Sequence, residues 1–308
     1  MKTNVLAGNH PWIDDWNMLV TDSQAQSNHA SHATADFNAN RQNADADAHA
    51  AYLNTLRWYI SGDANFANTA TNILNAWSST VITNTETGGG LSGLPTMSFA
   101  LAGELLRTYS GWRAADFSAF TNMMARYLYP SCSNFISYQP SQYAHWTSWD
   151  SPSAAAIIAI GVLCDNTNMF NQAADFYKYG ASGTGYGSGA ISNAVPFLYG
   201  SLGQPMESGR DQEHCSLGIG DLGVLCQVAW NQGTDLYGFG NNRLLAAVEY
   251  LARYSLSHNI PYTSLNPLAG APGGAHLFYI SKDGHGRIDD RPIYEMFYNH
   301  YVVQQGVG

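Results

Sequence analysis

Charged side chains are scarce in this sequence. Only 12% of the 308 residues are Asp, Glu, Lys or Arg, and 13 basic residues face 23 acidic ones, which gives a formal net charge of −10. A surface of that sign repels the phosphates of nucleic acids and of anionic membranes, so we expect neither as a partner. Lysine is rarest: three of the 13 basic residues are Lys and ten are Arg, whose planar guanidinium suits carboxylate recognition.

The signals of several other protein classes are missing as well. The longest apolar run, residues 154–164, is far shorter than the roughly 18 to 20 residues that span a bilayer. The four cysteines show no CxxC spacing, HExxH is missing, and neither the His29/His32 pair nor His285 has an obvious set of partners. We therefore predict no metal among the site residues and no cofactor, and whether a structural metal ion is bound stays open. No phosphate-binding loop or GxSxG motif supports a nucleotide-binding or serine-hydrolase function.

The chain is rich in aromatic and uncharged polar residues. Phe, Trp and Tyr make up 13% of the chain, with 8 Trp and 19 Tyr. Aromatic faces beside polar edges are surfaces on which sugar rings stack, so the composition favours a protein that handles carbohydrate. Residues 1–11 lack the apolar segment of a signal peptide. We expect a secreted protein whose signal peptide has been removed.

Apolar residues recur at helical spacing wherever they are periodic. At least eight such segments are joined by short polar connections, so consecutive helices should form antiparallel pairs. We predict an all-α fold, an (α/α) toroid in the form of an incomplete barrel of helical hairpins, in a single domain spanning residues 1–308. The predicted helices are residues 50–59, 66–77, 91–109, 117–127, 151–164, 169–179, 214–230 and 243–256.

Three stretches interrupt the helical pattern. They are residues 24–49, rich in Asn, Ala, Asp and His, residues 83–93, rich in Thr and Gly, and residues 261–290. Long loops in compact domains usually line or cover a binding site, so we expect residues 261–290 to form a groove wall or a lid. Within this loop, HLFYIS at residues 276–281 has the pattern of a short strand.

The densest polar cluster reads ESGRDQEH, residues 207–214, and stands directly before a long apolar run. On a helix that begins near Asp211, His214 would lie close to the first turn, where free backbone N–H groups favour an anion. Glu207 and Arg210 precede this start. A surface cluster of ion pairs and helix caps explains the same residues equally well.

A second cluster, RPIYEMFYNHY, occupies residues 291–301. If the segment is helical, Arg291, Tyr294 and Tyr298 share one face. A nearby guanidinium favours phenolate over phenol and would lower the pKa of a tyrosine from its usual value near 10. The alternative is a tyrosine-rich packing helix, which suits Tyr294 better than Tyr298.

A third cluster reads QYAHWTSWD, residues 142–150, and precedes a helix with hardly any charge. Tyr143, His145, Trp146 and Trp149 are candidates for a platform on which a sugar stacks. For at least one of the two tryptophans, packing in the core is the better interpretation.

Taken together, these and further segments resemble the alginate lyase superfamily, and in particular polysaccharide lyases of the family 38 type. The similarity extends in order from about Pro11 to Tyr301. It implies an (α/α) toroid that cleaves uronic-acid polysaccharides by β-elimination. The matching segments are WYISGD (58–63), ILNAWSS (73–79), SWD with AIGVL (148–163), ESGRDQ with His214, AWNQGTDLYG (229–238), NNRLL with EY and ARY (241–254), and YNHY (298–301).

The resemblance also assigns catalytic roles. Elimination from a 4-linked uronate requires a base for the C5 proton, donors that neutralise the adjacent carboxylate and an acid for the departing O4. Tyr298 corresponds to the base and acid. His214, Arg291 and Glu207 would bind or neutralise the carboxylate, with His214 as the alternative base for the opposite configuration at C5.

Further residues are expected to bind substrate or shape its groove. Ser148 and Glu213 stand where relatives usually carry Asn and Gly, which leaves the preferred uronate open. The expected binding residues are Arg210, Trp149, Asp150, His145, Tyr143 and His300, with Gln42 and Tyr52 from a loosely matching N-terminal segment.

We therefore predict a monomeric polysaccharide lyase that acts on glucuronan or an alginate-like polymer and leaves 4,5-unsaturated uronate ends. One alternative is a glycoside hydrolase on the same kind of toroid, with Glu207 and either Asp150 or Asp211 as its carboxylate pair. The other is a non-catalytic carbohydrate-binding toroid that uses Trp146 and Trp149.

Overall fold

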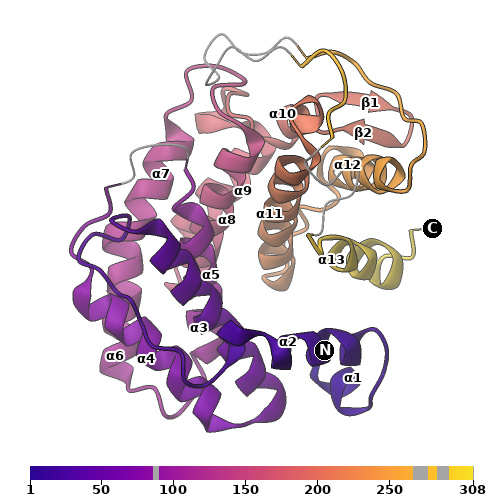
Figure 1. Cartoon of the computed structure of the whole chain (residues 1–308). Helices are drawn as coiled ribbons and strands as arrows, with labels where there is room; N and C mark the ends of the chain where they lie inside the picture. Colours follow the sequence, from indigo (N-terminus) through magenta and orange to yellow (C-terminus); the bar gives the residue numbers. More distant parts are fainter. Residues whose placement is uncertain (86–89, 266–276, 283–290, 308) are drawn as a thin grey trace. The chain divides into compact units, whose positions relative to one another are not determined.

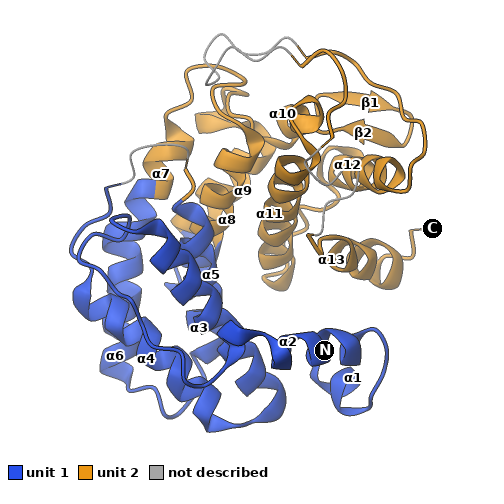
Figure 2. Ribbon diagram, viewed as in Figure 1, with its two compact units in different colours: residues 1–87, 92–131, 159–167 blue, residues 88–91, 132–158, 168–308 orange. Residues whose placement is uncertain are grey.

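The computed structural model describes residues 1–85, 90–265, 277–282 and 291–307 (Figure 1). Most of these residues are helical, which confirms the all-α class. No described helix is both long and apolar enough to cross a membrane. Contacts divide the chain into two compact units (Figure 2). Unit 1 comprises residues 1–87, 92–131 and 159–167, and unit 2 comprises residues 88–91, 132–158 and 168–308. The single domain stays a prediction.

Unit 1 is built around the long helix α3, which contacts both α4 and α5. Asn40 caps the start of α3, and Gly62 ends the helix in the left-handed conformation that favours glycine. Phe37, Trp77 and Phe99 form an aromatic core beside it. The elements of this unit are α1 (Lys2–Leu6), α2 (Trp12–Thr21), η1 (Ser23–Ala25), α3 (Arg41–Ser61), α4 (Ala64–Thr80), α5 (Gly93–Leu106), α6 (Ala114–Met123) and the π-helix η2 (Met124–Leu128).

Unit 2 holds the remaining helices and a small hairpin, in which β1 and β2 pair antiparallel with Phe197 opposite Gln204. Helix α7 begins in unit 1 and continues in unit 2 from Cys132, whereas helix α8 begins in unit 2 and its end, from Ala159, belongs to unit 1. The elements are α7 (Tyr129–Ser137), α8 (Thr147–Leu163), α9 (Thr167–Tyr179), η3 (Ala181–Gly183), α10 (Ile191–Ala194), β1 (Phe197–Tyr199), β2 (Leu202–Gln204), η4 (Met206–Gly209), α11 (Gln212–Asn231), α12 (Phe239–Ser255), α13 (Tyr294–Tyr298) and the π-helix η5 (Asn299–Gln304).

All the predicted helices are present, but some other expectations are wrong. Helix α3 begins at Arg41, so residues 41–49 are helical although an irregular stretch was expected. The buried face of this part of α3 is made of small alanines and Asp47, which give hardly any apolar periodicity. The expected strand at residues 276–281 is reduced to one bridge between Leu277 and Leu265. Residues 266–276 and 283–290, with His285, lie outside the described residues, so the lid stays a prediction.

Two glycines of α11 allow α13 to approach closely (Figure 1). A Cβ atom added at Gly220 would lie 2.8 Å from Cγ2 of Ile293. One added at Gly223 would meet Cε at the flexible end of Met296 and would lie 2.5 Å from Cζ of the Phe297 ring. Phe297 is itself buried. The glycines therefore set the position of the C-terminal segment on α11.

We expect Gly223→Ala to destabilise the protein. Alanine normally stabilises a helix by about 0.5–1 kcal/mol relative to glycine, but the new methyl group would collide with the Phe297 ring, and overpacking costs about 1–3 kcal/mol. Urea unfolding measures the net change. Gly223→Ala should cost less free energy of unfolding when it is introduced into the Phe297→Leu variant than into the wild type, because the shorter leucine leaves room for the new methyl group. A stabilising effect of Gly223→Ala would contradict this packing.

Candidate active site

The start of α11 carries a paired carboxylate and imidazole. Asp211 is the N-cap residue, and its side chain accepts a hydrogen bond from the backbone N–H of His214 at 2.7 Å. Nδ1 of His214 lies 2.8 Å from each carboxylate oxygen of Asp211. Burial raises the pKa of Asp211, but the hydrogen bonds from His214 outweigh it and lower the pKa overall. The ionised carboxylate favours a proton on Nδ1, so Nε2 of His214 accepts a proton in the neutral ring and donates one in the imidazolium.

Glu207 is buried one turn before this helix and joins it to the start of α8. Its Oε2 accepts a hydrogen bond from the backbone N–H of Ser148 at 2.7 Å, and its Oε1 accepts from the Ser148 hydroxyl at 3.0 Å. Nη1 of Arg210 also donates to Oε1 at 2.8 Å. Burial raises the pKa of Glu207, against the opposing effect of Arg210. Both oxygens of Glu207 are therefore occupied, and the carboxylate holds the guanidinium of Arg210 in place.

Arg210 is held from a second side by an aromatic ring. Its guanidinium carbon lies 4.7 Å from the ring centroid of Trp146, within the range of a cation–π interaction. Trp146 is only 5% exposed and belongs to a core cluster with Met206, Leu265 and Leu277. The expectation that one tryptophan belongs to the core is confirmed for Trp146. The guanidinium of Arg210 thus has a fixed orientation beside Asp211.

A second imidazole–carboxylate pair lies at the start of α8. Nδ1 of His145 is 3.2 Å from Oδ1 of Asp150, and the His145 ring stacks on Phe135 at a centroid distance of 4.4 Å. Asp150 is fully buried and accepts two further hydrogen bonds, from Nε2 of Gln139 and from the backbone N–H of Gly189, both at 3.0 Å. Asp150 is thereby fixed as the partner that orients His145.

The C-terminal segment reaches the same helix start. Nη1 of Arg291 donates to the backbone carbonyl of Glu213 at 2.8 Å, and Nη2 lies 3.2 Å from its carboxylate. Arg291 stands before the first residue of α13, so the predicted helical face with Tyr298 does not include it. Tyr298 closes α13 and is 61% exposed. Among the described residues, no hydrogen bond joins Tyr298 to His214 or Arg210.

The other expected binding residues lie in different surroundings. Tyr143 is partly buried, and burial raises the pKa of its phenol. Trp149 packs partly buried against the cluster of Trp146. His300 is buried and stacks on Tyr237 at 3.7 Å, which places it in an aromatic core. In unit 1, Gln42 is exposed near the start of α3, and Tyr52 is partly buried in the same helix.

Asp221 is a buried carboxyl group that no sequence motif marks as functional. It lies on α11, and the Ser151 hydroxyl donates to its Oδ2 at 3.4 Å. Burial raises its pKa to about 8, and the charge of Arg291 partly opposes the shift. Asp221 is therefore a neutral acid at neutral pH. Its position within an apolar helical run hides it in the sequence.

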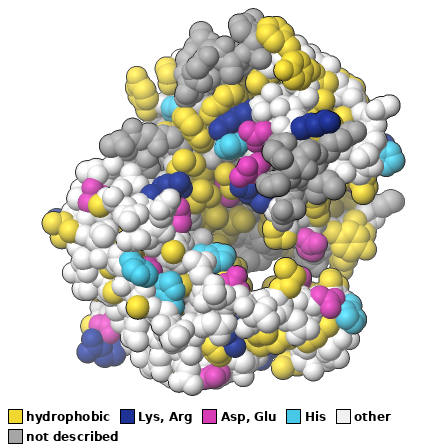
Figure 3. Space-filling view, viewed as in Figure 1, with side chains coloured by type: hydrophobic (Ala, Val, Ile, Leu, Met, Phe, Trp, Pro, Cys, Tyr) yellow, Lys and Arg dark blue, Asp and Glu magenta, His cyan; other side chains and the backbone are white. Residues whose placement is uncertain are grey.

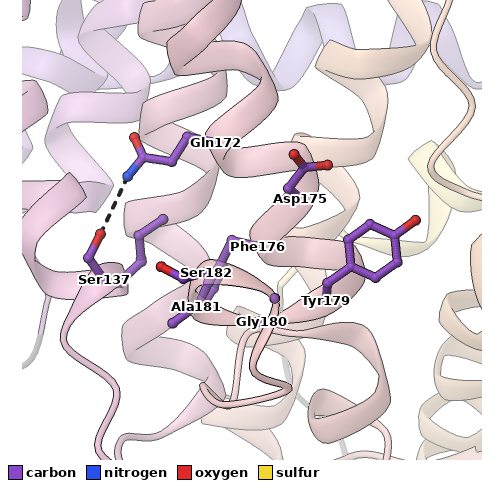
Figure 4. Close-up of a pocket in the computed structure, with 10 residues that line it drawn as sticks. Ser137, Gln172, Asp175, Phe176, Tyr179, Gly180, Ala181 and Ser182 are labelled. Atoms are coloured by element: carbon purple, nitrogen blue, oxygen red, sulfur yellow. Dashed lines mark hydrogen bonds between the residues drawn. The ribbon is translucent and has the colours of Figure 1, made fainter.

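Charged groups are few on the visible surface and form small groups separated by uncharged side chains (Figure 3). A cavity of about 430 Å³ lies apart from the predicted site residues, among α7, α9 and η3 (Figure 4). Gln172 and Ser137 form a hydrogen bond on one side of it, and Asp175 and Tyr179 lie on the other. None of the predicted site residues lines this cavity.

Comparisons with known proteins give one family match and one similar fold. A sequence model of the family described as Alginate lyase matches residues 9–260. The chain is similar to a solved structure of a histidine-to-alanine variant of alginate lyase A1-III complexed with a tetrasaccharide, with 13% sequence identity and a TM-score of 0.55. That alignment covers 76% of this chain and 67% of the other, and it supports the helical-toroid fold class. Curated protein sequences gave no significant match.

We expect the Asp221→Asn variant to change how stability depends on pH. A carboxyl group with a raised pKa in the folded state stabilises the protein fully below its unfolded pKa, and this contribution is lost as pH rises through the folded value of about 8. From roughly pH 5 to that value, the free energy of unfolding of the wild type should fall by about 1.4 kcal/mol per pH unit relative to the variant.

Urea unfolding at unit steps of pH provides the measurement. Asp175→Asn, which alters an exposed carboxylate, is the matched control. Stability curves of the wild type and Asp221→Asn that stay parallel across this range would contradict a neutral Asp221.

Proposed function

The chain belongs to the alginate lyase family of polysaccharide lyases, and we propose that it cleaves a 4-linked uronic-acid polysaccharide, glucuronan or an alginate-like polymer, by β-elimination. The observation that carries this proposal is the Asp211–His214 pair beside the fixed guanidinium of Arg210. The more specific assignment to the family 38 type, the secretion of the protein and its monomeric state remain expectations from sequence.

The uronate carboxylate must accept negative charge when C5 loses its proton. We assign this carboxylate to Arg210 and to His214 in its imidazolium form. Glu207 and Asp211 each hold one N–H of these side chains, which fixes the direction of the remaining N–H groups toward substrate. Preorganised donors of this kind stabilise a developing charge without reorganising during the reaction. Arg291, bonded to Glu213 next to His214, supplies further positive charge.

Tyr298 is the proposed base and acid. Its phenolate would take the C5 proton, the C5–H electron pair would form the C4–C5 double bond, and the same phenol would return the proton to O4 as that oxygen leaves. A polymer requires an accessible group, and Tyr298 is exposed on a helix that packs against α11. In the alternative assignment for the opposite C5 configuration, Nε2 of His214 removes the proton.

The hydrogen bonds of the candidate carboxylates disfavour a glycoside hydrolase. A glycoside hydrolase needs one carboxylic acid that protonates the leaving oxygen and a second carboxylate that acts on the sugar. Glu207 is 1% exposed and uses both oxygens in hydrogen bonds to Ser148 and Arg210. Asp150 is fully buried with both oxygens bonded. A stacking platform made of Trp146 and Trp149 is equally disfavoured, because Trp146 belongs to the core.

Incubation with separate polymers should identify the substrate. We expect glucuronan, polymannuronate or polyguluronate to yield products that absorb in the near ultraviolet, since elimination leaves a C4–C5 double bond conjugated with the carboxylate. Reducing ends must increase in step with this absorbance. An increase in reducing ends without absorbance would show hydrolysis, and binding without any change in polymer length would show a carbohydrate-binding protein.

The Tyr298→Phe variant tests the proposed base. We expect kcat to fall by about 10²- to 10⁴-fold with little change in KM, because general acid–base catalysis contributes about that much and the ring itself is retained. Tyr138→Phe, which alters another exposed tyrosine in unit 2, should keep wild-type kinetics. A Tyr298→Phe enzyme with near-wild-type kcat would exclude this tyrosine and direct attention to His214.

A further inference from the structure

Unit 1 contains a compact cluster of two imidazoles around one buried carboxylate. Asp47 lies on α3 and is fully buried. Its Oδ1 lies 2.9 Å from Nε2 of His29 and 3.0 Å from Nδ1 of His32. The two rings meet edge to face at a centroid distance of 5.8 Å. The sequence shows no obvious partner for these two histidines, and in the structure Asp47 supplies one.

The two oxygens of Asp47 have different tasks. Three donors hold Oδ2: the Ser31 hydroxyl at 2.9 Å, the backbone N–H of His32 at 2.6 Å and Nε1 of Trp77 at 2.8 Å. Oδ1 faces the two imidazole nitrogens. One oxygen of Asp47 is thus anchored by hydrogen bonds, and the other faces the imidazoles. Carboxylates that bind a metal ion are commonly oriented by hydrogen bonds in this way.

The distances fit a small divalent ion. The three candidate ligand atoms lie within 4.8 Å of one another. In a tetrahedral zinc site with bonds of about 2.0–2.1 Å, neighbouring ligand atoms are about 3.3 Å apart. The two imidazole nitrogens would therefore move away from Oδ1 by only a few tenths of an ångström. A set of two nitrogens and one oxygen suits zinc better than calcium or magnesium, which prefer oxygen ligands.

We propose that His29, His32 and Asp47 form a binding site for a zinc-type divalent cation that fastens the irregular segment between η1 and α3 to the helices of unit 1. The His32 side chain is 54% exposed, so the fourth position of a tetrahedral ion is open to water from that side. Trp77 connects the same carboxylate to α4, so the ion would link this segment to both α3 and α4. The site is independent of the proposed lyase chemistry.

Zinc binding to the full chain tests the proposal. After removal of metals with a chelator, calorimetric titration should show one tight Zn²⁺ site, and Tm should rise with zinc concentration because the ion binds only the folded state. Cobalt(II) bound in its place should give the strong visible absorption of tetrahedral coordination.

His32→Ala is the informative variant because its side chain is the most exposed of the three ligands. Loss of outer partners typically weakens a metal site about 10- to 100-fold, so loss of a ligand should weaken zinc binding more than about 100-fold. Ser31→Ala removes one hydrogen bond to Oδ2 and should weaken zinc binding by about 10- to 100-fold. His10→Ala, which breaks an exposed histidine–aspartate pair with Asp14, should bind zinc as the wild type does.

Two results would overturn the proposal. One is a wild-type protein that binds no zinc and shows no rise in Tm, which would leave Asp47 as a hydrogen-bonded structural carboxylate. The other is a His32→Ala protein that binds zinc as tightly as the wild type, which would place the ion elsewhere, such as at the Asp211–His214 pair.

Discussion

The buried carboxylate of Glu207 is the constraint on which the candidate site depends. Burying an ionised carboxylate costs several kcal/mol unless hydrogen bonds and opposite charge replace water. Ser148 and Arg210 provide these partners, so the start of α8, the residues before α11 and the guanidinium must occupy fixed positions together. The orientation of Arg210 follows from the need to satisfy Glu207, and Trp146 closes the remaining side.

Carboxylates in this sparsely charged chain repeatedly orient imidazoles. Asp211 fixes His214, Asp150 fixes His145, and Asp47 engages two histidines in unit 1. For Asp47, burial raises the pKa but the hydrogen bonds from the histidines and Trp77 lower it overall, so the group stays ionised. In each case the carboxylate fixes the position of the imidazole ring. A chain with few charged residues thus orients its histidines through these carboxylate partners.

The features that the sequence predicts correctly are those that depend on residues close together in the chain. Helix α11 begins where the ESGRDQEH cluster indicated, with Asp211 as its cap and His214 close behind, because capping is a contact between residues three apart. The contacts that organise the site are long-range. Glu207 and Ser148 are 59 residues apart, and His29 and Asp47 are 18 apart, so neither pair leaves a pattern in the sequence. Helix α3 was underestimated because alanines line its buried face.

The acidity of the chain and a polyanionic substrate are compatible on physical grounds. Salt screens the repulsion between exposed charges of the protein and of a polyanion when they are more than about 10 Å apart. At contact, the local groups decide: the backbone N–H groups at the start of α11, the guanidinium of Arg210 and a neutral Asp221 all lie on or near one helix. Arg210 and Arg291 are each paired with a carboxylate, which limits their long-range field. Recognition of a uronate would therefore rest on directed short hydrogen bonds, in which the orientation of each donor matters more than the total charge.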